Sequence, residues 1–452
     1  MINDSYAQEQ WTSKLKFSFY CIFIYVCLYT FPFPLDWFVS VIQRFFKFIS
    51  DISGWAFLIT VNDAIDTFFG FWNDLWEWFI PIFAKNVLHL QKPITDFPSG
   101  SGDTTYNYVQ LLVNIILSFL GGLVWLYFSK QKANHSKLYQ LLITGLRYYI
   151  ATTMLSYGFA KVFQNQFPYP YLARLVQPYG ESSPMGLAWT FMGYSKGYNF
   201  YTGIAEVIGG FFLIFRQTKT FGALFTMTVC TTIFVMNLCY DIPVKLFSGH
   251  LLLFATFIAM QDCNNLVAFF FKNKTAQLIQ SSFYFENHKK IKLFRYLKWF
   301  MVLFLFYVNY SDNKKSYNED LNYNKAVPLY GIYNAERKIV NNDTVPLIYK
   351  DTSNWKQLII STSGSARVRL LNDSLRRFTF RIDTAKNEIV YFPAKDSSTK
   401  FRFKYKVSNG LLSMHGGVKS DSVVLEFTKY DESKYLLNSR GFNWINEVPY
   451  NR

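Results

Sequence analysis

The segment NFYTGIAEVIGGFFLIF, residues 199–215, is apolar enough for the interior of a membrane, yet it carries Glu206 near its middle. Three other segments of similar character lie close by in the chain, at residues 138–160, 220–238 and 247–271. Each of the four is long enough to cross a hydrocarbon layer of ~30 Å as a helix. The sequence therefore predicts a membrane-embedded all-α bundle with a four-helix core over residues 138–271.

Composition indicates a membrane part joined to a soluble part. Of the 452 residues, 51% are hydrophobic and 17% are charged, and the net charge is +16. The basic residues cluster beside apolar segments, so attraction to lipid and control of topology explain the charge without nucleic acid. The five cysteines form no C-x-x-C pair and the five histidines form no metal-binding pattern. The sequence thus predicts a lipid bilayer as partner and gives no support for a metal site.

Three further apolar segments complete a seven-span prediction, at residues 17–33, 106–128 and 299–310. Residues 129–137 hold Lys130, Lys132 and Lys137 without one acidic residue, and the positive-inside rule places such a loop in the cytoplasm. We therefore expect a bacterial inner-membrane protein with a cytoplasmic amino terminus and a periplasmic carboxyl terminus. The predicted parts are a first span (1–34), a second span with its cytoplasmic loop (106–137), the core, and a basic cytoplasmic loop with the last span (272–310).

Two aromatic-rich regions are harder to assign. Residues 35–105 are interrupted by charges at short intervals, which favours interfacial helices on the outer face, with two more spans as the alternative. Residues 167–201 carry four prolines among aromatic residues, so they cannot form one regular helix. We expect this second region to fold down as a lid over the bundle, either structural or substrate-binding.

From residue 311 the pattern changes to short alternating segments. Phe401, Phe403 and Tyr405 alternate with basic residues, which is the period of two of a half-buried strand. Similar segments occur at 366–371, 377–382, 388–392 and 423–427, separated by turn-forming pairs such as Asn409-Gly410 and Gly416-Gly417. We predict a periplasmic all-β domain over residues 311–452, either a sandwich or a small barrel.

Four residues are candidates for a polar intramembrane site: Arg147, Tyr157, Lys161 and Glu206. Arg147 and Lys161 are fourteen residues apart and share one helix face, and Glu206 lies between Gly203 and Gly210, which would let another helix approach closely. Ionisable groups at this depth are expected to pair near the midplane, and a spare positive charge would suit an anionic ligand. An ion pair that only fixes helix packing is the equally weighted alternative.

A second group of candidates lies at the outer end of the predicted core. Asn237, Asp241, Lys245 and His250 surround a proline-containing turn. Asp241 and Lys245 are expected to pair, and Asn237 and His250 to point toward the bundle.

At these residues the chain resembles the DoxX family of bacterial membrane proteins. The resemblance covers residues 140–271 and is carried by Tyr157-Gly-Phe-Ala-Lys161 and by Gly203-x-x-Glu206-x-x-Gly-Gly210. It looks closest to long Bacteroidetes proteins of this type, with stretches similar to Ser101-Gly-Asp-Thr-Thr105 and Arg440-Gly-Phe-Asn-Trp-Ile-Asn446. The resemblance implies a four-helix core and a link with redox chemistry, and through it quinone is a conceivable cofactor. No cofactor motif supports quinone independently.

Two functions from different classes follow. The first is a membrane subunit of a redox or envelope assembly with a polar site under the lid. The second is a non-enzymatic membrane-anchored protein whose β domain recruits membrane or periplasmic protein partners. A small-solute transporter is a third possibility, but the sequence shows no inverted repeat.

Overall fold

The computed structural model describes residues 11–35, 39, 57–94, 101–129, 135–275, 288–346, 354–362, 364–393, 400–418 and 420–451. The chain divides into two compact units. The first comprises Met1–Val162 and Phe200–Asn309 and is helical, whereas the second comprises Phe163–Asn199 and Tyr310–Arg452 and contains all the described strands.

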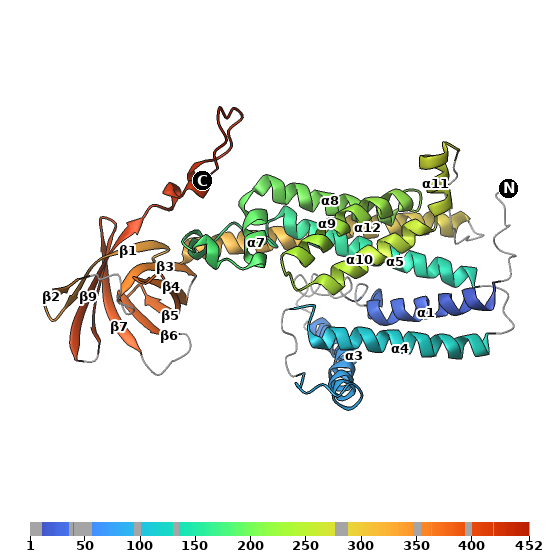
Figure 1. Ribbon diagram of the computed structural model, residues 1–452, viewed down its shortest axis with the longest axis horizontal. Coiled ribbons are helices and arrows are strands. Elements are labelled where there is room, and N and C mark those ends of the chain that lie inside the picture. Colours follow the sequence, from blue (N-terminus) through green and yellow to red (C-terminus); the bar gives the residue numbers. More distant parts are fainter. Residues whose placement is uncertain are drawn as a thin grey trace. The chain divides into compact units, whose positions relative to one another are not determined.

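Long helices build the first unit (Figure 1). They are α1 Ser13–Thr30, α3 Phe57–Asn86, α4 Thr105–Phe128, α5 Ser136–Val162, α8 Lys196–Ile214, α9 Lys219–Cys239, α10 Lys245–Met260, α11 Cys263–Lys272 and α12 His288–Ala326, of which α8 and α12 extend across the unit boundary. Fully buried side chains of α5, α8 and α10 form the core, among them Ile150, Leu155, Leu213, Ala255 and Ile258. The apolar segments of the sequence thus become packed helices, as predicted.

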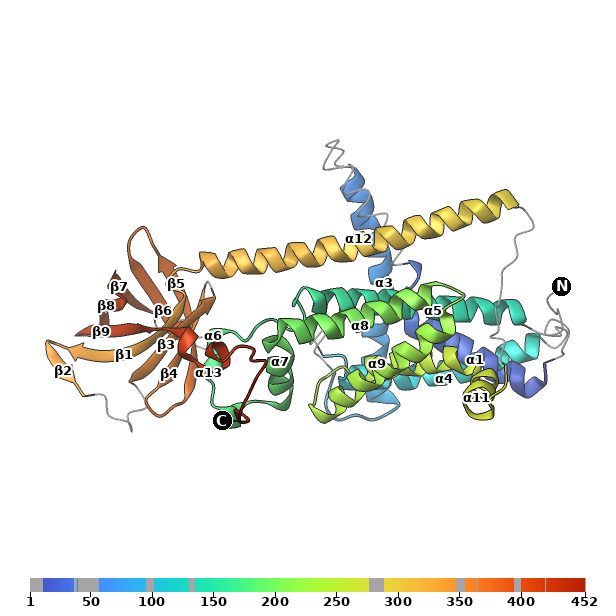
Figure 2. The ribbon, with the colours of Figure 1, turned by 90° about the horizontal axis from the view of Figure 1, so that it is seen from above.

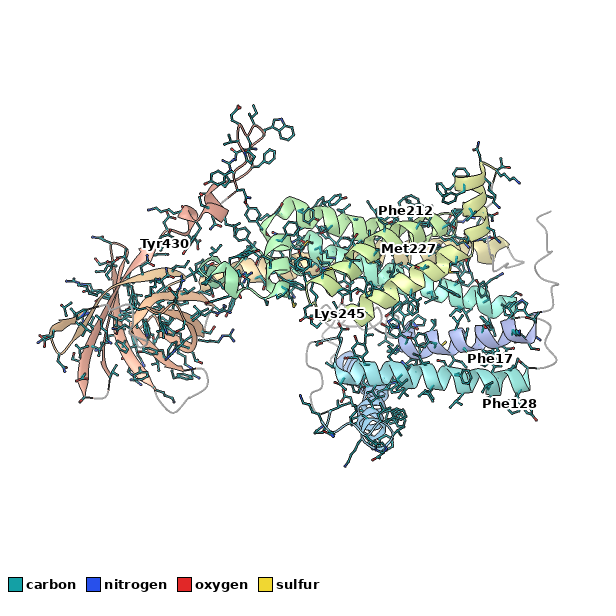
Figure 3. The ribbon with its side chains drawn as sticks, viewed as in Figure 1. Phe17, Phe128, Phe212, Met227, Lys245 and Tyr430 are labelled. Atoms are coloured by element: carbon teal, nitrogen blue, oxygen red, sulfur yellow. The ribbon has the colours of Figure 1, made fainter. Side chains whose placement is uncertain are left out.

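Within the described residues, α4 and α9 are long and apolar enough to cross a membrane. The pair α10 and α11 passes the same test only together, and it bends by 74° at residues 261–262, so residues 247–271 form two helices instead of the one predicted. Side chains along α4 are apolar and exposed, including Phe128 at 79% (Figure 3). Two helices, or three with the bent pair, therefore have the length and composition of a span, and the seven-span topology stays a prediction.

Residues 35–105 are described only in part. Residues 36–38, 40–56 and 95–100 lie outside the described residues, as do 130–134 and 276–287 of the two predicted cytoplasmic loops. Residues 57–86 form the single helix α3, whose Trp76, Ile80 and Ala84 pack against Val109 and Val113 of α4. The structure therefore gives this region a long helix packed on the bundle, and whether it lies on the membrane or crosses it stays a prediction.

Helix α12 is much longer than the predicted last span. It covers 39 residues, and Figure 2 shows it as one continuous rod. The change of composition at residue 311 ends the apolar run but not the helix: residues 311–326 are polar and remain helical, with an i,i+4 ion pair between Lys315 and Glu319 at 3.8 Å. The second unit resumes at Tyr310, next to the predicted boundary at 311, but its residues 311–326 are helical and its first strand begins only at Gly331.

Antiparallel strands form the β-barrel of the second unit. They are β1 Gly331–Val340, β2 Asp343–Val345, β3 Trp355–Thr362, β4 Ser365–Leu370, β5 Leu375–Asp383, β6 Glu388–Pro393, β7 Phe401–Ser408, β8 Leu411–Val418 and β9 Asp421–Tyr430. Strands β1 and β3–β9 pair in sequence order, pairing of β1 with β9 closes the barrel, and β2 adds a short hairpin to β1. Inward side chains such as Leu358, Phe380, Phe403, Met414 and Phe427 are fully buried, so side chains fill the barrel.

All five strands expected from the sequence are present, and the barrel is the correct one of the two predicted alternatives. The turn at Asn409-Gly410 is confirmed, since both residues have positive φ between β7 and β8. The turn predicted at Gly416-Gly417 is wrong, because both glycines lie inside β8. A Cβ at Gly416 would collide with the backbone of Arg402 on β7, so this glycine permits close strand approach.

Residues 163–199 belong to the second unit. They contain three short helices, α6 Leu172–Leu175, the 3₁₀-helix η2 Tyr179–Glu181 and α7 Pro184–Tyr194. Buried Leu172, Ala173 and Val176 pack against Ile332 of β1 and Ile359 of β3. This part of the segment therefore packs on the barrel, and the lid over the helices stays a prediction. After β9 the chain continues through η3 Glu432–Lys434 and α13 Leu436–Ser439 into the tail, residues 440–451.

Candidate functional site

A buried ion pair joins α5 to α8. The Lys161 Nζ donates to Glu206 Oε1, and the two residues are only 5% and 1% exposed. Charged groups are rarely buried to this extent unless they are paired. The predicted pairing of Glu206 with a cation is thus confirmed, and that cation is Lys161.

Glycines bring the two helices into backbone contact at this pair. A Cβ on Gly158 would lie 2.8 Å from the carbonyl oxygen of Gly203, and one on Gly203 would lie 2.6 Å from that of Gly158. One on Gly210 would lie 2.9 Å from the carbonyl oxygen of Ala151. Any side chain at these positions would push the helices apart, so the sequence prediction that glycines flank Glu206 to admit another helix is confirmed.

The second carboxylate oxygen of Glu206 has no hydrogen-bond partner within the described part of the chain. This atom, Glu206 Oε2, is buried. The hydroxyl oxygen of Thr226 on α9 is also buried and also has no hydrogen-bond partner among the described residues. Cys230 lies one turn after Thr226 on the same face of α9 and is within electrostatic range of both Lys161 and Glu206. A buried oxygen without a donor costs free energy, so this site can accept a hydrogen bond or a proton.

Tyr157 lies one helical turn before Lys161 on α5. Its ring is 42% exposed and is 5.9 Å from the ring of Phe247 on α10, and its hydroxyl is within electrostatic range of Glu206. Tyr157 therefore lies at the edge of the site rather than inside it.

Arg147 does not belong to this site, so the expected meeting of Arg147 and Glu206 near the midplane is wrong. Its Nε and Nη2 donate to the carbonyl oxygens of Leu213 and Ile214, each at 3.0 Å. The glycine contacts show that α5 and α8 run antiparallel, with Gly158 opposite Gly203 and Ala151 opposite Gly210. In this register Arg147 faces the carboxyl-terminal end of α8, where an arginine satisfies free carbonyl groups.

The outer-side candidates gather around the beginning of α10. Lys245 Nζ is 3.1 Å from the carboxylate of Asp241, which confirms that predicted pair, and the buried Asn237 amide donates to Ser248 at 2.9 Å. His250 is buried, with its Nε2 2.5 Å from the Tyr25 hydroxyl and its Nδ1 2.6 Å from the Leu246 carbonyl oxygen. All four therefore have structural partners, and both Asn237 and His250 point into the bundle as expected.

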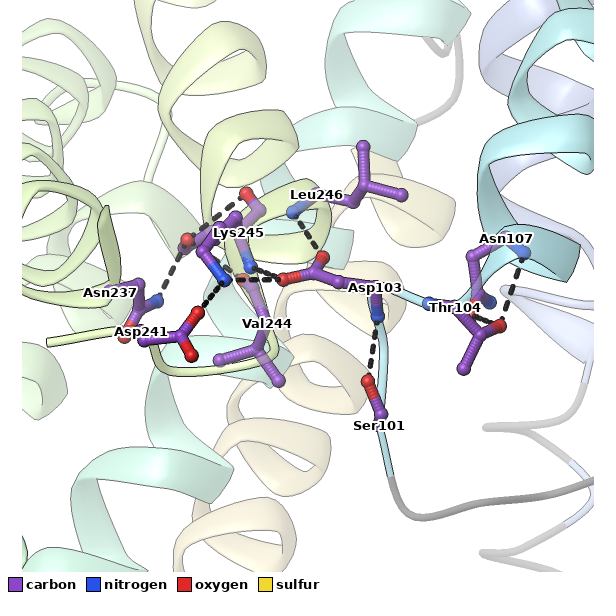
Figure 4. Close-up of polar contacts among 10 residues, drawn as sticks. Ser101, Asp103, Thr104, Asn107, Asn237, Asp241, Val244, Lys245 and Leu246 are labelled. Atoms are coloured by element: carbon purple, nitrogen blue, oxygen red, sulfur yellow. Dashed lines mark hydrogen bonds and ion pairs between the residues drawn. The ribbon is translucent and has the colours of Figure 1, made fainter. Parts of the chain in front are cut away.

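Asp103 is the central residue of this region, and the sequence analysis missed it. Its two carboxylate oxygens accept hydrogen bonds from the backbone N–H groups of Lys245 at 2.7 Å and Leu246 at 2.9 Å, and Lys245 Nζ lies 3.7 Å away (Figure 4). Val244, the N-cap residue of α10, supplies no side-chain cap, so Asp103 caps this helix from a distant loop. The signal was the Ser-Gly-Asp-Thr-Thr stretch at residues 101–105, which has the composition of a capping loop.

The same loop starts α4. The Thr104 backbone N–H donates to the Asn107 side chain at 3.1 Å, and the Asn107 backbone N–H donates to the Thr104 hydroxyl at 3.4 Å, which is a capping box. Gly102 N–H also donates to the Pro243 carbonyl oxygen at 2.8 Å. Residues 101–104 thus fix the beginnings of α4 and α10 to each other.

No group of three or more His, Cys, Asp or Glu side chains in the described ranges could hold a metal ion.

An apolar pocket of ≈ 360 Å³ lies between α1, α4, α5 and α10 and is lined by Tyr25, Ile115, Leu146 and Phe254 among others. It is separate from the Lys161–Glu206 pair, whose residues do not line it.

Comparison with known proteins gives one distant relative. An uncharacterized protein of Bacillus subtilis (strain 168), YwoB, is 29% identical over 133 residues, which cover 27% of this chain and 79% of the relative. No family model matches the chain, and no solved structure matches it. The chain is therefore similar over about a quarter of its length to an uncharacterized protein.

Proposed function

We propose that the chain is a DoxX-like integral membrane protein of the bacterial inner membrane and serves there as a membrane subunit of a redox or envelope assembly. The exposed apolar side chains of α4 and the composition of α9 support insertion into a bilayer. The glycine-lined crossing of α5 and α8 supports the DoxX-like resemblance, because it uses the residues that carry it. The cytoplasmic amino terminus and periplasmic barrel follow from the loop charges.

The observation that carries the proposal is the Lys161–Glu206 pair with its spare carboxylate oxygen. A buried ion pair with a purely structural role stabilises the fold most when every carboxylate lone pair accepts a hydrogen bond. Glu206 Oε2 has no donor among the described residues. Buried ionisable groups in membrane helices mark proton or ligand sites. The site is suited to a hydrogen-bond donor, supplied by a small ligand or by a proton taken up during turnover of the assembly.

The test is to isolate the chain from its native membrane in mild detergent after cross-linking and to identify the subunits and small molecules that accompany it. The informative variant is Lys161→Met with Glu206→Gln, which removes both charges and leaves no unpaired buried ion. A matched control is Arg337→Met with Glu426→Gln, which neutralises an ion pair of 2.8 Å on the barrel surface. Loss of a specific companion in the first variant but not in the control supports the proposal. An identical set of companions in all three proteins, at equal membrane yield, would contradict it.

The second candidate function is recruitment of envelope proteins by the barrel. Side chains fill its interior, so any partner binds the outer surface or the tail. The tail exposes Phe442, Trp444 and Ile445, with Trp444 at 87%. Replacing Phe442 and Trp444 by serine should remove cross-linked protein partners while leaving the chain in the membrane, and unchanged partners would exclude this role.

A further inference from the structure

Cations gather where α8 ends and α9 begins. Arg147 donates to two of the last carbonyl oxygens of α8, and Lys298 of α12 donates to one of them, that of Ile214, at 2.9 Å. Lys298 also lies 5.1 Å from the ring centre of Phe215. These two cations are explained by the helix itself, because its carboxyl-terminal end carries partial negative charge.

Further positive charge lies beside these two. Lys219 at the start of α9 is buried and donates to the Gln261 side chain at 2.8 Å, and its Nζ is 3.8 Å from the carboxylate of Asp262. Lys219 is within electrostatic range of both Arg147 and Arg216. We call Arg147, Lys219 and Lys298 the α8-end cluster, because Arg147 is within electrostatic range of both lysines. Among the described residues, Asp262 is the carboxylate within 4 Å of this cluster, and it lies beside Lys219. Neutral carbonyl and amide oxygens, which carry no compensating charge, are the closer partners of all three.

The surroundings of the α8-end cluster are apolar and exposed. Phe221 follows Lys219 on α9, and Trp299 and Phe300 follow Lys298 on α12, and all three side chains are exposed. The Phe215 ring is 5.0 Å from that of Trp299. Buried positive charge next to exposed aromatic rings suits a ligand with an anionic head and an apolar body.

We propose that the α8-end cluster binds the phosphate group of an anionic phospholipid. This inference rests on the proposed membrane insertion but not on any role of Glu206. Lys298 is half-buried and offers its ammonium group to the phosphate, whereas Arg147 and Lys219 are buried and attract the phosphate through their charge. The ligand thus neutralises charge that the helix end only partly compensates. The lipid chains lie along the exposed rings. Free phosphate offers the same head-group chemistry without the apolar contacts.

The experiment is native mass spectrometry of the full chain, purified in detergent, with phosphatidylglycerol, phosphatidylcholine or inorganic phosphate added. The variant Lys298→Gln removes the charge and keeps a donor for the Ile214 carbonyl oxygen, and Lys298→Arg keeps both. Lys14→Gln is the matched control, because Lys14 is an exposed lysine at the beginning of α1. We expect phosphatidylglycerol to be preferred over phosphatidylcholine. Lys298→Gln should weaken that binding about fivefold, the effect of roughly one basic residue near a membrane surface.

We also expect the Lys298→Arg and Lys14→Gln variants to bind phosphatidylglycerol as well as the wild-type protein does. Equal retention of the two lipids by the wild-type protein overturns the proposal, and so does an equal loss in Lys14→Gln. Displacement of phosphatidylglycerol by inorganic phosphate identifies the phosphate as the group recognised, whereas binding of inorganic phosphate without any lipid preference overturns the assignment to lipid. The double variant Lys161→Met with Glu206→Gln, which leaves no unpaired buried charge, should keep the lipid preference, so failure here and failure of the proposed function are separate outcomes.

Discussion

Removing one member of the Lys161–Glu206 pair should destabilise the helical unit far more than removing both. Glu206→Gln leaves the Lys161 ammonium buried beside a neutral amide, and Lys161→Met leaves the carboxylate beside a thioether. Because the two residues are 5% and 1% exposed, solvent cannot reach the remaining charge without opening the bundle. Breaking a buried pair in this way costs about 3–5 kcal/mol.

The double variant should recover most of that loss. Met and Gln are close in volume to Lys and Glu, and neither carries a charge that needs a partner, so we expect a net cost of about 1 kcal/mol. The two single variants together should therefore cost at least about 6 kcal/mol, and because the double variant costs only about 1 kcal/mol, the coupling free energy should have the opposite sign and a magnitude of about 5 kcal/mol or more.

The assay is reversible unfolding of all four proteins in one detergent, followed by circular dichroism of the helices. A double-mutant cycle from these data gives the coupling free energy directly. Single variants that each cost less than about 1 kcal/mol, or costs that simply add in the double variant, would refute the claim that the pair is buried and mutually dependent.

Three further predictions concern the helix cap, the helix crossing and the barrel. Asp103→Asn should lower the unfolding free energy of the helical unit by about 1 kcal/mol and Asp103→Ala by about 2, because the carboxylate caps α10 through two backbone N–H groups; equal stability of all three proteins in detergent unfolding would exclude the cap. Gly203→Ala should cost about 1–3 kcal/mol in the same assay, because its Cβ would lie 2.6 Å from the Gly158 carbonyl oxygen. Gly145→Ala, with open space around it inside α5, should instead stabilise the unit by up to about 1 kcal/mol. Burial raises the pKa of Tyr333 to about 12 from its ordinary value of 10.0, so barrel stability should be complete below pH 10 and fall as the pH rises toward 12. Unfolding followed by near-UV circular dichroism should show a smaller alkaline loss in Tyr333→Phe, and an identical pH dependence would contradict the assignment.

Sequence patterns were reliable where one local period determined the structure. The alternation around Phe401 and Phe403 predicted β7, and the Asn409-Gly410 pair predicted its turn, because both depend on neighbouring residues alone. Strands such as β3, where Leu358, Ile359 and Ile360 follow one another, have no clean alternation and were not predicted. Gly416 was misread as a turn because its role depends on the backbone of β7, which no local pattern shows.

The candidate site was predictable in its residues but not in its pairing. Glycine spacing around Glu206 indicated a close helix crossing, and the crossing is present. The register between α5 and α8 decides which cation pairs with Glu206, and this register cannot be read from a single sequence. Lys161 therefore took the place given to Arg147, and Asp103 was missed because its partners lie 142 residues away.

Chemical accessibility of position 206 tests the central claim most directly. In a chain whose five cysteines are replaced by serine or alanine, Glu206→Cys and Asp241→Cys can be treated in intact cells and in inverted vesicles with a membrane-impermeant maleimide. The Asp241 side chain is 86% exposed, whereas Glu206 is buried between α5 and α8. We expect Asp241→Cys to react from the periplasmic side only and Glu206→Cys to react from neither side. Labelling of Glu206→Cys as fast as that of Asp241→Cys would contradict a buried site inside a membrane bundle.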